Sequence, residues 1–265
     1  MNVFGGARFA GKGPRGPRGF RGRDSSIVEF CTWLPQTVLK NLQANDETCC
    51  FFIQDPAKDL KRNGKEILEW ISRSLPGLNL VAEKSTKEIE LLEDRYVMTF
   101  KKTRYSSEDL SLLPNIPNTY GFLCITFRAS TVDQVLLSDY QKEIASTGYC
   151  EIKLLATGEI FIHVHTAVAV IQPPISYNNW TTLFIECSSG ETTTHYSYRI
   201  KEHSGSFVGP TTTEGRGGFS LGSRWDDTLF FNGQIASLEM YSIENSASFP
   251  EGIKKTVIKN QSIKL

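Results

Sequence analysis

The stretch Phe231-Asn-Gly-Gln-Ile-Ala-Ser-Leu-Glu-Met-Tyr241 decides the fold class of this chain. From Gln234 onward its residues follow a period of two, which is typical of a half-buried β-strand. One face of the strand is predicted to hold Ala236, Leu238 and Met240, and the other face Ile235, Glu239 and Tyr241. Asn232-Gly233 is a strong hairpin signal, because both central positions of a type I′ turn need a positive φ. The stretch therefore predicts an antiparallel hairpin between 228–231 and 234–241.

Similar short runs recur upstream, separated by turn residues. They are 49–53, 66–71, 95–100, 121–127, 135–137, 150–154, 159–164, 180–185, 195–200 and 218–221. A dozen strands with little helix between them predict an all-β fold, a two-sheet antiparallel jelly-roll sandwich over 46–265. In the run that begins at Trp180, alternation places the indole on one face with Thr182 and Phe184, and predicts that it docks between the sheets.

The amino-terminal residues 1–24 have a different composition, with 7 of the 21 glycines and six basic residues. From Gly13 the triplets Gly-Pro-Arg, Gly-Pro-Arg, Gly-Phe-Arg and Gly-Arg-Asp follow one another. Glycine at every third position is required at the axis of a collagen triple helix. Four triplets are too few to fold alone, so we interpret the segment as an extended, collagen-like tail that ends a longer stem and joins three chains.

Residues 25–45 are predicted to form a neck with a short helix. Pro35 suits the first turn of a helix, and Leu34, Val38 and Leu42 recur on one face. Two interpretations remain open at this point: the helix associates three chains beneath the stem, or it packs on its own sandwich.

Three stretches resemble laminin-G-like and pentraxin-like members of the concanavalin A-like lectin/glucanase superfamily. They are Asn178-Asn-Trp-Thr-Thr-Leu-Phe-Ile-Glu186, Gly218-Phe-Ser-Leu-Gly-Ser-Arg-Trp225 and the closing stretch 231–241. The resemblance covers about residues 46–245 and implies the jelly-roll fold. Combined with the triplets, it implies a collagen-stemmed matrix or recognition protein. It does not identify a ligand, since such domains bind glycans or proteins.

Enzymatic activity is not expected. A retaining glucanase needs two carboxylates about 5–5.5 Å apart, and the E-x-D-x-E arrangement that supplies them is absent from the sequence. Glu88-Ile-Glu90 and Glu93-Asp94 are interpreted as a solvated loop between strands. There is no Gly-x-Ser-x-Gly motif, and no aromatic residues alternate with the tail arginines as a nucleic-acid site would need.

Two sets of residues are candidate metal ligands. His163 and His165 share a face of a predicted strand at a spacing that two ligands of one metal can have, although no third ligand is marked. Asp139, Asp226 and Asp227 are predicted in loops near strand ends, where calcium is bound by loop oxygens. For both sets, solvated surface residues are the alternative interpretation.

The sequence favours an extracellular protein without a membrane span. Its longest aliphatic run, 167–171, is far shorter than the about 20 residues of a spanning helix. No apolar signal-peptide region follows Met1, so we expect either a different start or another export route. Asn179-Trp-Thr181 and Asn260-Gln-Ser262 are N-glycosylation motifs.

Three functions remain as hypotheses. The first is a binding or adhesion protein whose sandwich head recognises a glycan or an extracellular protein, with avidity raised by trimerisation. The second is a structural matrix or viral-fibre protein whose sandwich caps the trimer. The third, a glucanase-like enzyme, is remote.

Overall fold

The computed structural model describes residues 47–53, 55–72, 79–84, 88–92, 95–107, 119–139, 150–164, 166–211 and 218–244. The tail predicted over 1–24 and the neck predicted over 25–45 lie outside these residues. Within the described part the only helix is the single turn α3 (Pro56–Asp59), and Asp55 caps it by accepting a hydrogen bond from the Ala57 N–H at 3.1 Å. No described helix has the length and hydropathy to span a membrane.

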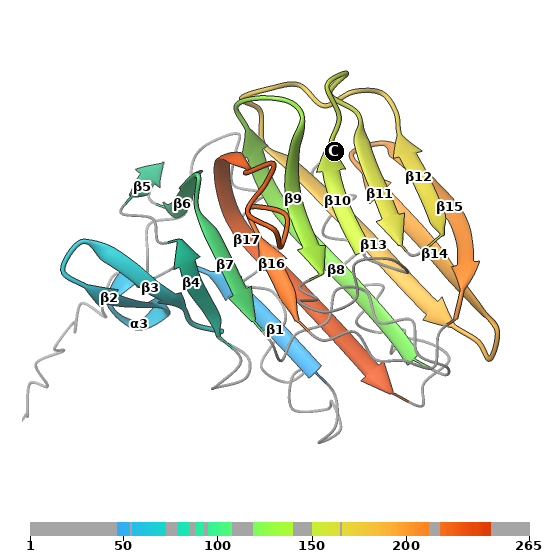
Figure 1. Ribbon diagram of the computed structural model, residues 1–265, viewed down its shortest axis with the longest axis horizontal. Helices are drawn as coiled ribbons and strands as arrows, with labels where there is room; N and C mark the ends of the chain where they lie inside the picture. The colour runs from blue at the N-terminus through green and yellow to red at the C-terminus, as the bar shows by residue number, and fades with distance from the viewer. Residues whose placement is uncertain are drawn as a thin grey trace, which may run out of the picture.

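The described strands form two antiparallel sheets, which lie one behind the other in Figure 1. The strands of the first sheet are β1 (Glu47–Phe52), β5 (Ile89–Leu92), β6 (Arg95–Lys101), β8 (Thr119–Ala129), β13 (Thr181–Ser189), β14 (Thr193–Ile200), β15 (His203–Pro210) and β17 (Asn232–Glu244). Their order is β15-β14-β13-β8-β17-β6-β5, and β1 also pairs with β17.

The second sheet follows the order β12-β11-β10-β9-β16-β7-β4-β3-β2. Its strands are β2 (Leu60–Asn63), β3 (Glu66–Trp70), β4 (Leu80–Lys84), β7 (Arg104–Ser107), β9 (Gln134–Asp139), β10 (Cys150–Leu154), β11 (Ile160–Val164), β12 (Ala167–Ile171) and β16 (Phe219–Leu221). In Figure 1 this sheet extends from β12 on the right to β2 on the left. The architecture is the two-sheet antiparallel jelly-roll sandwich that the sequence predicts.

One apolar core fills the space between the sheets. Alternate residues of the central strands point into it, for example Leu183, Ile185 and Cys187 of β13. Phe231 packs edge-on against the rings of Phe100 and Phe127, at 6.1 Å between ring centroids in both pairs. Burial of these side chains is the main source of stability for a sandwich of this kind.

The hairpin predicted at Asn232-Gly233 is wrong. Residues 228–231 are not a strand, and Asn232 and Gly233 are the first residues of β17, where they pair with Lys101 and Phe100 of β6. Glycine is needed here for a close backbone approach and not for a turn. A Cβ atom at Gly233 would lie 2.2 Å from the carbonyl oxygen of Arg128.

The predicted faces of the last strand are also wrong at its beginning. The register between β17 and β8 shifts between Ile235 and Ser237, which marks a β-bulge. An extra residue at a bulge reverses the alternation beyond it. Ile235 therefore shares the core with Leu238 and Met240, whereas Ala236 lies in a small separate cluster with Val97.

Trp180 does not dock between the sheets as predicted. It is half-buried on the outer side of the first sheet, where it packs on the cluster of Val97 and Ala236. The guanidinium of Arg128 lies 5.3 Å from its ring centroid. The inward face of β13 is the one that begins with Thr181 and continues with Leu183, because cross-strand packing selects that face.

Several strands carry no clear alternation and were not predicted, among them β2, β4, β5, β7, β12 and β15. The stretch containing Glu88 and Glu90, interpreted as a solvated loop, forms β5 in part. Glu90 is half-buried there and accepts hydrogen bonds from Thr99 at 3.1 Å and Gln234 at 2.6 Å. Cross-strand hydrogen bonds, and not an apolar pattern, hold this carboxylate in the sheet.

Gly233→Ala is predicted to lower the free energy of unfolding by about 3 kcal/mol, because the methyl group overlaps a backbone oxygen that cannot move away. Gly64→Ala is the control. Gly64 has a φ of +60° and open space around it, so only the backbone penalty of about 1 kcal/mol applies. Urea unfolding measures both, and equal losses would contradict the close approach at Gly233.

A pH dependence is predicted for Glu69 in the β2–β3 hairpin. Its hydrogen bond from Lys61 holds the pKa of the Glu69 carboxyl below the usual value, and burial opposes this. Lys61 is largely exposed, so Glu69→Gln should cost only about 0.5 kcal/mol at pH 7. This contribution is complete above the unfolded-state pKa and is lost as the pH falls through the lowered pKa. Urea unfolding at pH 7 and pH 3 tests it, and a constant difference would refute the linkage.

Candidate ligand-binding surface

A row of polar side chains crosses the outer face of the second sheet. From β11 to β7 the row consists of His163, Glu151, Ser138, Ser220 and Ser106, which are successive cross-strand partners. Each of them has at least one neighbour along its strand that belongs to the apolar core: Ile162, Ile152, Leu137, Leu221 and Tyr105. Because side chains alternate along a strand, the row faces away from the first sheet.

Residues 222–231, which we call the covering loop, lie over the middle of this row. The hydroxyls of Ser138 and Ser220 both donate to the carbonyl oxygen of Ser223, at 3.3 Å and 3.1 Å. The loop is closed by a hydrogen bond of 2.8 Å from the N–H of Phe231 to the carbonyl of Gly222. The two serines are therefore buried although they lie on the outside of the sheet.

The start of the covering loop requires a glycine. Gly222 has a φ of +89°, and a Cβ atom there would lie 2.5 Å from a ring carbon of Phe100 and 2.7 Å from the carbonyl of Thr103. Its N–H donates to the Leu136 carbonyl at 2.9 Å. This position combines a left-handed conformation with a close approach, and both favour glycine.

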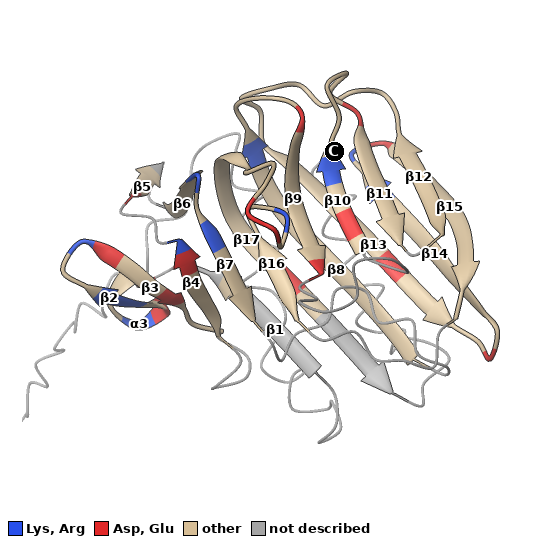
Figure 2. Ribbon diagram, in the orientation of Figure 1, with Lys and Arg blue, Asp and Glu red and all other residues tan. Residues whose placement is uncertain are grey.

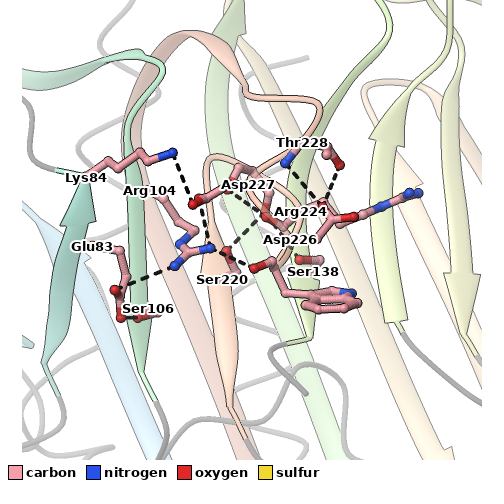
Figure 3. A network of polar contacts seen from close by, with 12 residues as sticks. Glu83, Lys84, Arg104, Ser106, Ser138, Ser220, Arg224, Asp226, Asp227 and Thr228 are labelled. Carbon is pink, nitrogen blue, oxygen red and sulfur yellow. Dashed lines mark hydrogen bonds and ion pairs between the residues drawn. The ribbon is translucent and has the colours of Figure 1, made fainter. Parts of the chain in front are cut away.

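Arg104 joins the covering loop to β7 and β4, as Figure 3 shows. Its guanidinium donates to the Trp225 carbonyl at 2.7 Å and pairs with Asp227 at 2.9 Å. Glu83 lies 3.6 Å away on the other side and accepts a hydrogen bond from Ser106 at 2.9 Å. The arginine side chain is only 8% exposed. A buried guanidinium surrounded by acceptors fixes the position of the loop.

Arg224 makes a second, two-pronged contact with the sheet. Its Nε and Nη2 donate to the two carboxylate oxygens of Glu151, at 2.7 Å and 3.0 Å. The Glu151 side chain is 3% exposed and that of Arg224 29%. Bidentate pairs of this kind are strong and directional, so the carboxylate at the centre of the row is already engaged by the protein.

Beside the covering loop lie β10, β11 and β12 at one end of the sheet, where several outward side chains are exposed in full or in part. We call Lys153, Phe161, His163, Val168 and Val170 the β10–β12 patch. Phe161 pairs across the strands with Lys153 and Val170, and its ring centroid lies 5.9 Å from that of His163. Val168 and Val170 are 53% and 44% exposed. Figure 2 shows charges of both signs on β10 and none on β12. The patch therefore combines partly exposed rings and valines with a charged border.

The predicted histidine pair is described only in part. His163 is half-exposed and belongs to the patch, whereas His165 lies outside the described residues. In the part of the chain that the structure describes, no three His, Cys, Asp or Glu side chains gather as a metal site would need. A shared metal remains a prediction.

The three aspartates predicted for calcium occupy different settings. Asp139 is the last residue of β9 and not a loop residue; it is buried and accepts a hydrogen bond from the Cys150 N–H at 3.0 Å. Asp226 accepts from the N–H and hydroxyl of Thr228 within the covering loop. Asp227 is paired with Arg104 and with Lys84 at 3.1 Å. These two cations disfavour calcium at Asp227, and the calcium role of all three remains a prediction.

Of the two predicted N-glycosylation motifs, the structure describes one. Asn179 is exposed in the turn before β13, whereas Asn260 lies outside the described residues. Cys124, Cys150 and Cys187 are buried in strands.

Reasoning from the sequence missed the residues that organise this surface, chiefly Arg104, Glu151 and Arg224. Glu151 and Arg224, which pair with each other, are 73 residues apart in the sequence. The alternation Cys150-Glu-Ile-Lys-Leu154 did carry a signal, because it places Glu151 and Lys153 on the face opposite to three core residues. The residues next to Arg224 in the sequence do not indicate that its side chain pairs with Glu151 of β10.

Comparisons with solved structures show similarity in fold. A GH54 α-L-arabinofuranosidase mutant soaked with 4-nitrophenyl α-L-arabinofuranoside aligns with a TM-score of 0.52 and 12% identity, over 75% of this chain and 51% of that chain. An endo-1,3-β-glucanase from Streptomyces sioyaensis aligns with a TM-score of 0.45 and 9% identity, over 76% of this chain and 98% of that chain. Basic winged bean lectin with Tn-antigen aligns with a TM-score of 0.39 and 9% identity, over 75% of this chain and 98% of that chain.

This chain thus spans about half the length of the arabinofuranosidase chain, and the likeness to that enzyme shows the sandwich fold. No protein-family model matches the sequence, and no curated protein matches it.

Arg224→Met is predicted to lower the free energy of unfolding by about 3 kcal/mol, because it leaves the Glu151 carboxylate buried without its guanidinium. Adding Glu151→Gln should restore most of the loss, since the amide carries no charge. Urea unfolding of the two single variants and the double variant forms the cycle. Additive losses in the double variant would contradict a direct coupling between the two side chains.

Proposed function

We propose that this chain is a non-catalytic binding protein whose β10–β12 patch contacts a glycan. The observation that carries the proposal is a partly exposed Phe161 ring and two exposed valines, Val168 and Val170, beside Lys153 and the Arg224–Glu151 pair. A sugar presents apolar C–H faces and a rim of hydroxyls, and a ring flanked by donors and acceptors complements both.

The choice of a glycan as the first ligand class also draws on the shared fold. The arabinofuranosidase that has this sandwich was soaked with an arabinofuranoside. At 12% identity a shared fold does not imply a shared ligand. The arabinofuranoside only makes glycans the first class of ligand to test.

The charges on this face support binding over catalysis. Glu83, Glu151 and Asp227 are each held by an arginine in the structure. A glycosidase needs one carboxyl that takes up and releases a proton and a second that attacks or activates water. Carboxylates locked in ion pairs suit neither role. A reducing-sugar assay on laminarin and arabinan is expected to give no activity, and turnover would overturn this part of the proposal.

A protein ligand is the second candidate, and the valines favour it. Val168 and Val170 lie on β12, the edge strand of the second sheet, and exposed apolar residues on an edge are typical of contact surfaces. The proposal also includes secretion and trimerisation through residues 1–24. Trimerisation would raise the avidity of the protein for either class of ligand.

The glycan proposal is tested with the fluorescently labelled full chain on a glycan array. We expect signal for a defined group of glycans, and at least a tenfold loss of affinity for the best of them in Phe161→Ala and Lys153→Ala. Val208→Ala is the control for an exposed apolar residue outside the patch, because Val208 is 54% exposed and lies on β15 of the other sheet. Its affinity should be unchanged.

Two results would count against the proposal. A folded chain that binds no glycan on the array would exclude glycan recognition and direct attention to a protein ligand. Binding that survives both patch substitutions would place the site elsewhere on the sandwich.

A further inference from the structure

The first residue of β13, Thr181, carries a buried hydroxyl that makes no hydrogen bond within the described fold. Thr181 pairs with Phe127 of β8 and shares its face with Leu183, so its side chain points toward the core. It is 2% exposed, and its Oγ1 has no hydrogen-bond partner among the described residues. Burying a hydroxyl without a partner reduces stability.

Valine would fill the same space without this disadvantage. Threonine and valine have nearly the same shape and the same preference for strands, and they differ in the replacement of a hydroxyl by a methyl group. The hydroxyl of Thr181 therefore calls for an explanation outside the folded core.

Asn179 supplies that explanation two residues upstream. It is exposed in the turn that leads into β13, and the hydrogen bond from the Asn178 N–H to the Ala129 carbonyl, at 2.9 Å, fixes this turn beside the end of β8. Trp180 lies between the two residues and packs against the sheet, so it separates an outward asparagine from an inward threonine. Asn-x-Thr is the acceptor motif for N-glycosylation, in which the hydroxyl is read together with the asparagine.

We propose that Asn179 is an N-glycosylation site and that Thr181 is a threonine because this reaction needs its hydroxyl. The side-chain amide nitrogen of Asn179 forms a bond to C1 of the first N-acetylglucosamine of a lipid-diphosphate-linked oligosaccharide. The bond from C1 to the phosphate oxygen breaks, the diphosphate leaves with the electron pair, and the amide loses one proton to a base of the transferase. Because the hydroxyl is buried in the folded sandwich, the transfer precedes the folding of β13.

The proposal concerns modification and does not depend on glycan recognition by the β10–β12 patch. It requires export through a compartment that contains the transferase. The finished glycan stays outside the fold, since Asn179 is on the surface.

The test uses the full chain secreted from cultured human cells behind a signal peptide, in an Asn260→Gln background that removes the other motif. Peptide-N-glycosidase F is expected to shift the secreted chain to lower mass and to convert Asn179 to aspartate, as read by peptide mass spectrometry. Asn179→Gln and Thr181→Val should abolish the shift, whereas Thr181→Ser, which keeps the hydroxyl, should retain it.

The folding role of the hydroxyl is measured separately on unglycosylated full chain from bacteria. Thr181→Val is expected to keep or raise the Tm. A clear fall in Tm would show that the hydroxyl stabilises the fold and would overturn the argument, as would a secreted chain that the glycosidase leaves unchanged. Asn179→Gln leaves the core intact, so a glycosidase shift that persists in this variant refutes the site even if Thr181→Val fails to fold.

Discussion

The sandwich depends on the pairing of its last strand. β17 pairs with β8 along one edge, and with β6 and then β1 along the other. The segments joined in this way are far apart in sequence, so the first sheet is complete only when the carboxyl-terminal part of the chain is in place. The bulge after Ile235 bends the strand and directs Ile235, Leu238 and Met240 into one core. This packing against the second sheet provides the rigid frame on which the surface loops rest.

The second sheet shows how such a frame positions charged groups. The covering loop leaves the second sheet at Gly222 and leads after Phe231 into β17 of the first sheet. Arg224 of the loop pairs with Glu151 of β10, and Asp227 of the loop pairs with Arg104 of β7. Isolated surface ion pairs contribute little, but Arg104 and Glu151 are buried, and buried charges must keep their partners. The loop is therefore held over β9 and β16, reaches Glu151 of β10 through Arg224, and leaves the β10–β12 patch uncovered. The proposed contact surface is this uncovered part of the sheet.

The two proposals concern different residues of the fold and different chemistry. The patch lies on the outer face of the second sheet, where its rings, valines and charges would meet the proposed ligand. Asn179 lies in the turn that leads into a strand of the first sheet, and its motif includes a threonine whose buried hydroxyl has no hydrogen-bond partner among the described residues. An exported chain would thus carry a glycan of its own and bind another, through residues that share no contact in the described structure.

The sequence by itself determined the fold class, because alternation with a period of two is a local property that each strand carries in its own residues. The alternation in 150–154 also carried a signal for the outward face of Glu151 and Lys153. Only the tertiary structure decided that Asn232-Gly233 begins a strand, that Trp180 lies on the outer side, and that Glu151 belongs with Arg224. Alternation defines two faces but not which one is buried, and neither bulges nor ion pairs between distant residues leave a local signal. Those choices are made by the partner strand, which the chain meets only when it folds.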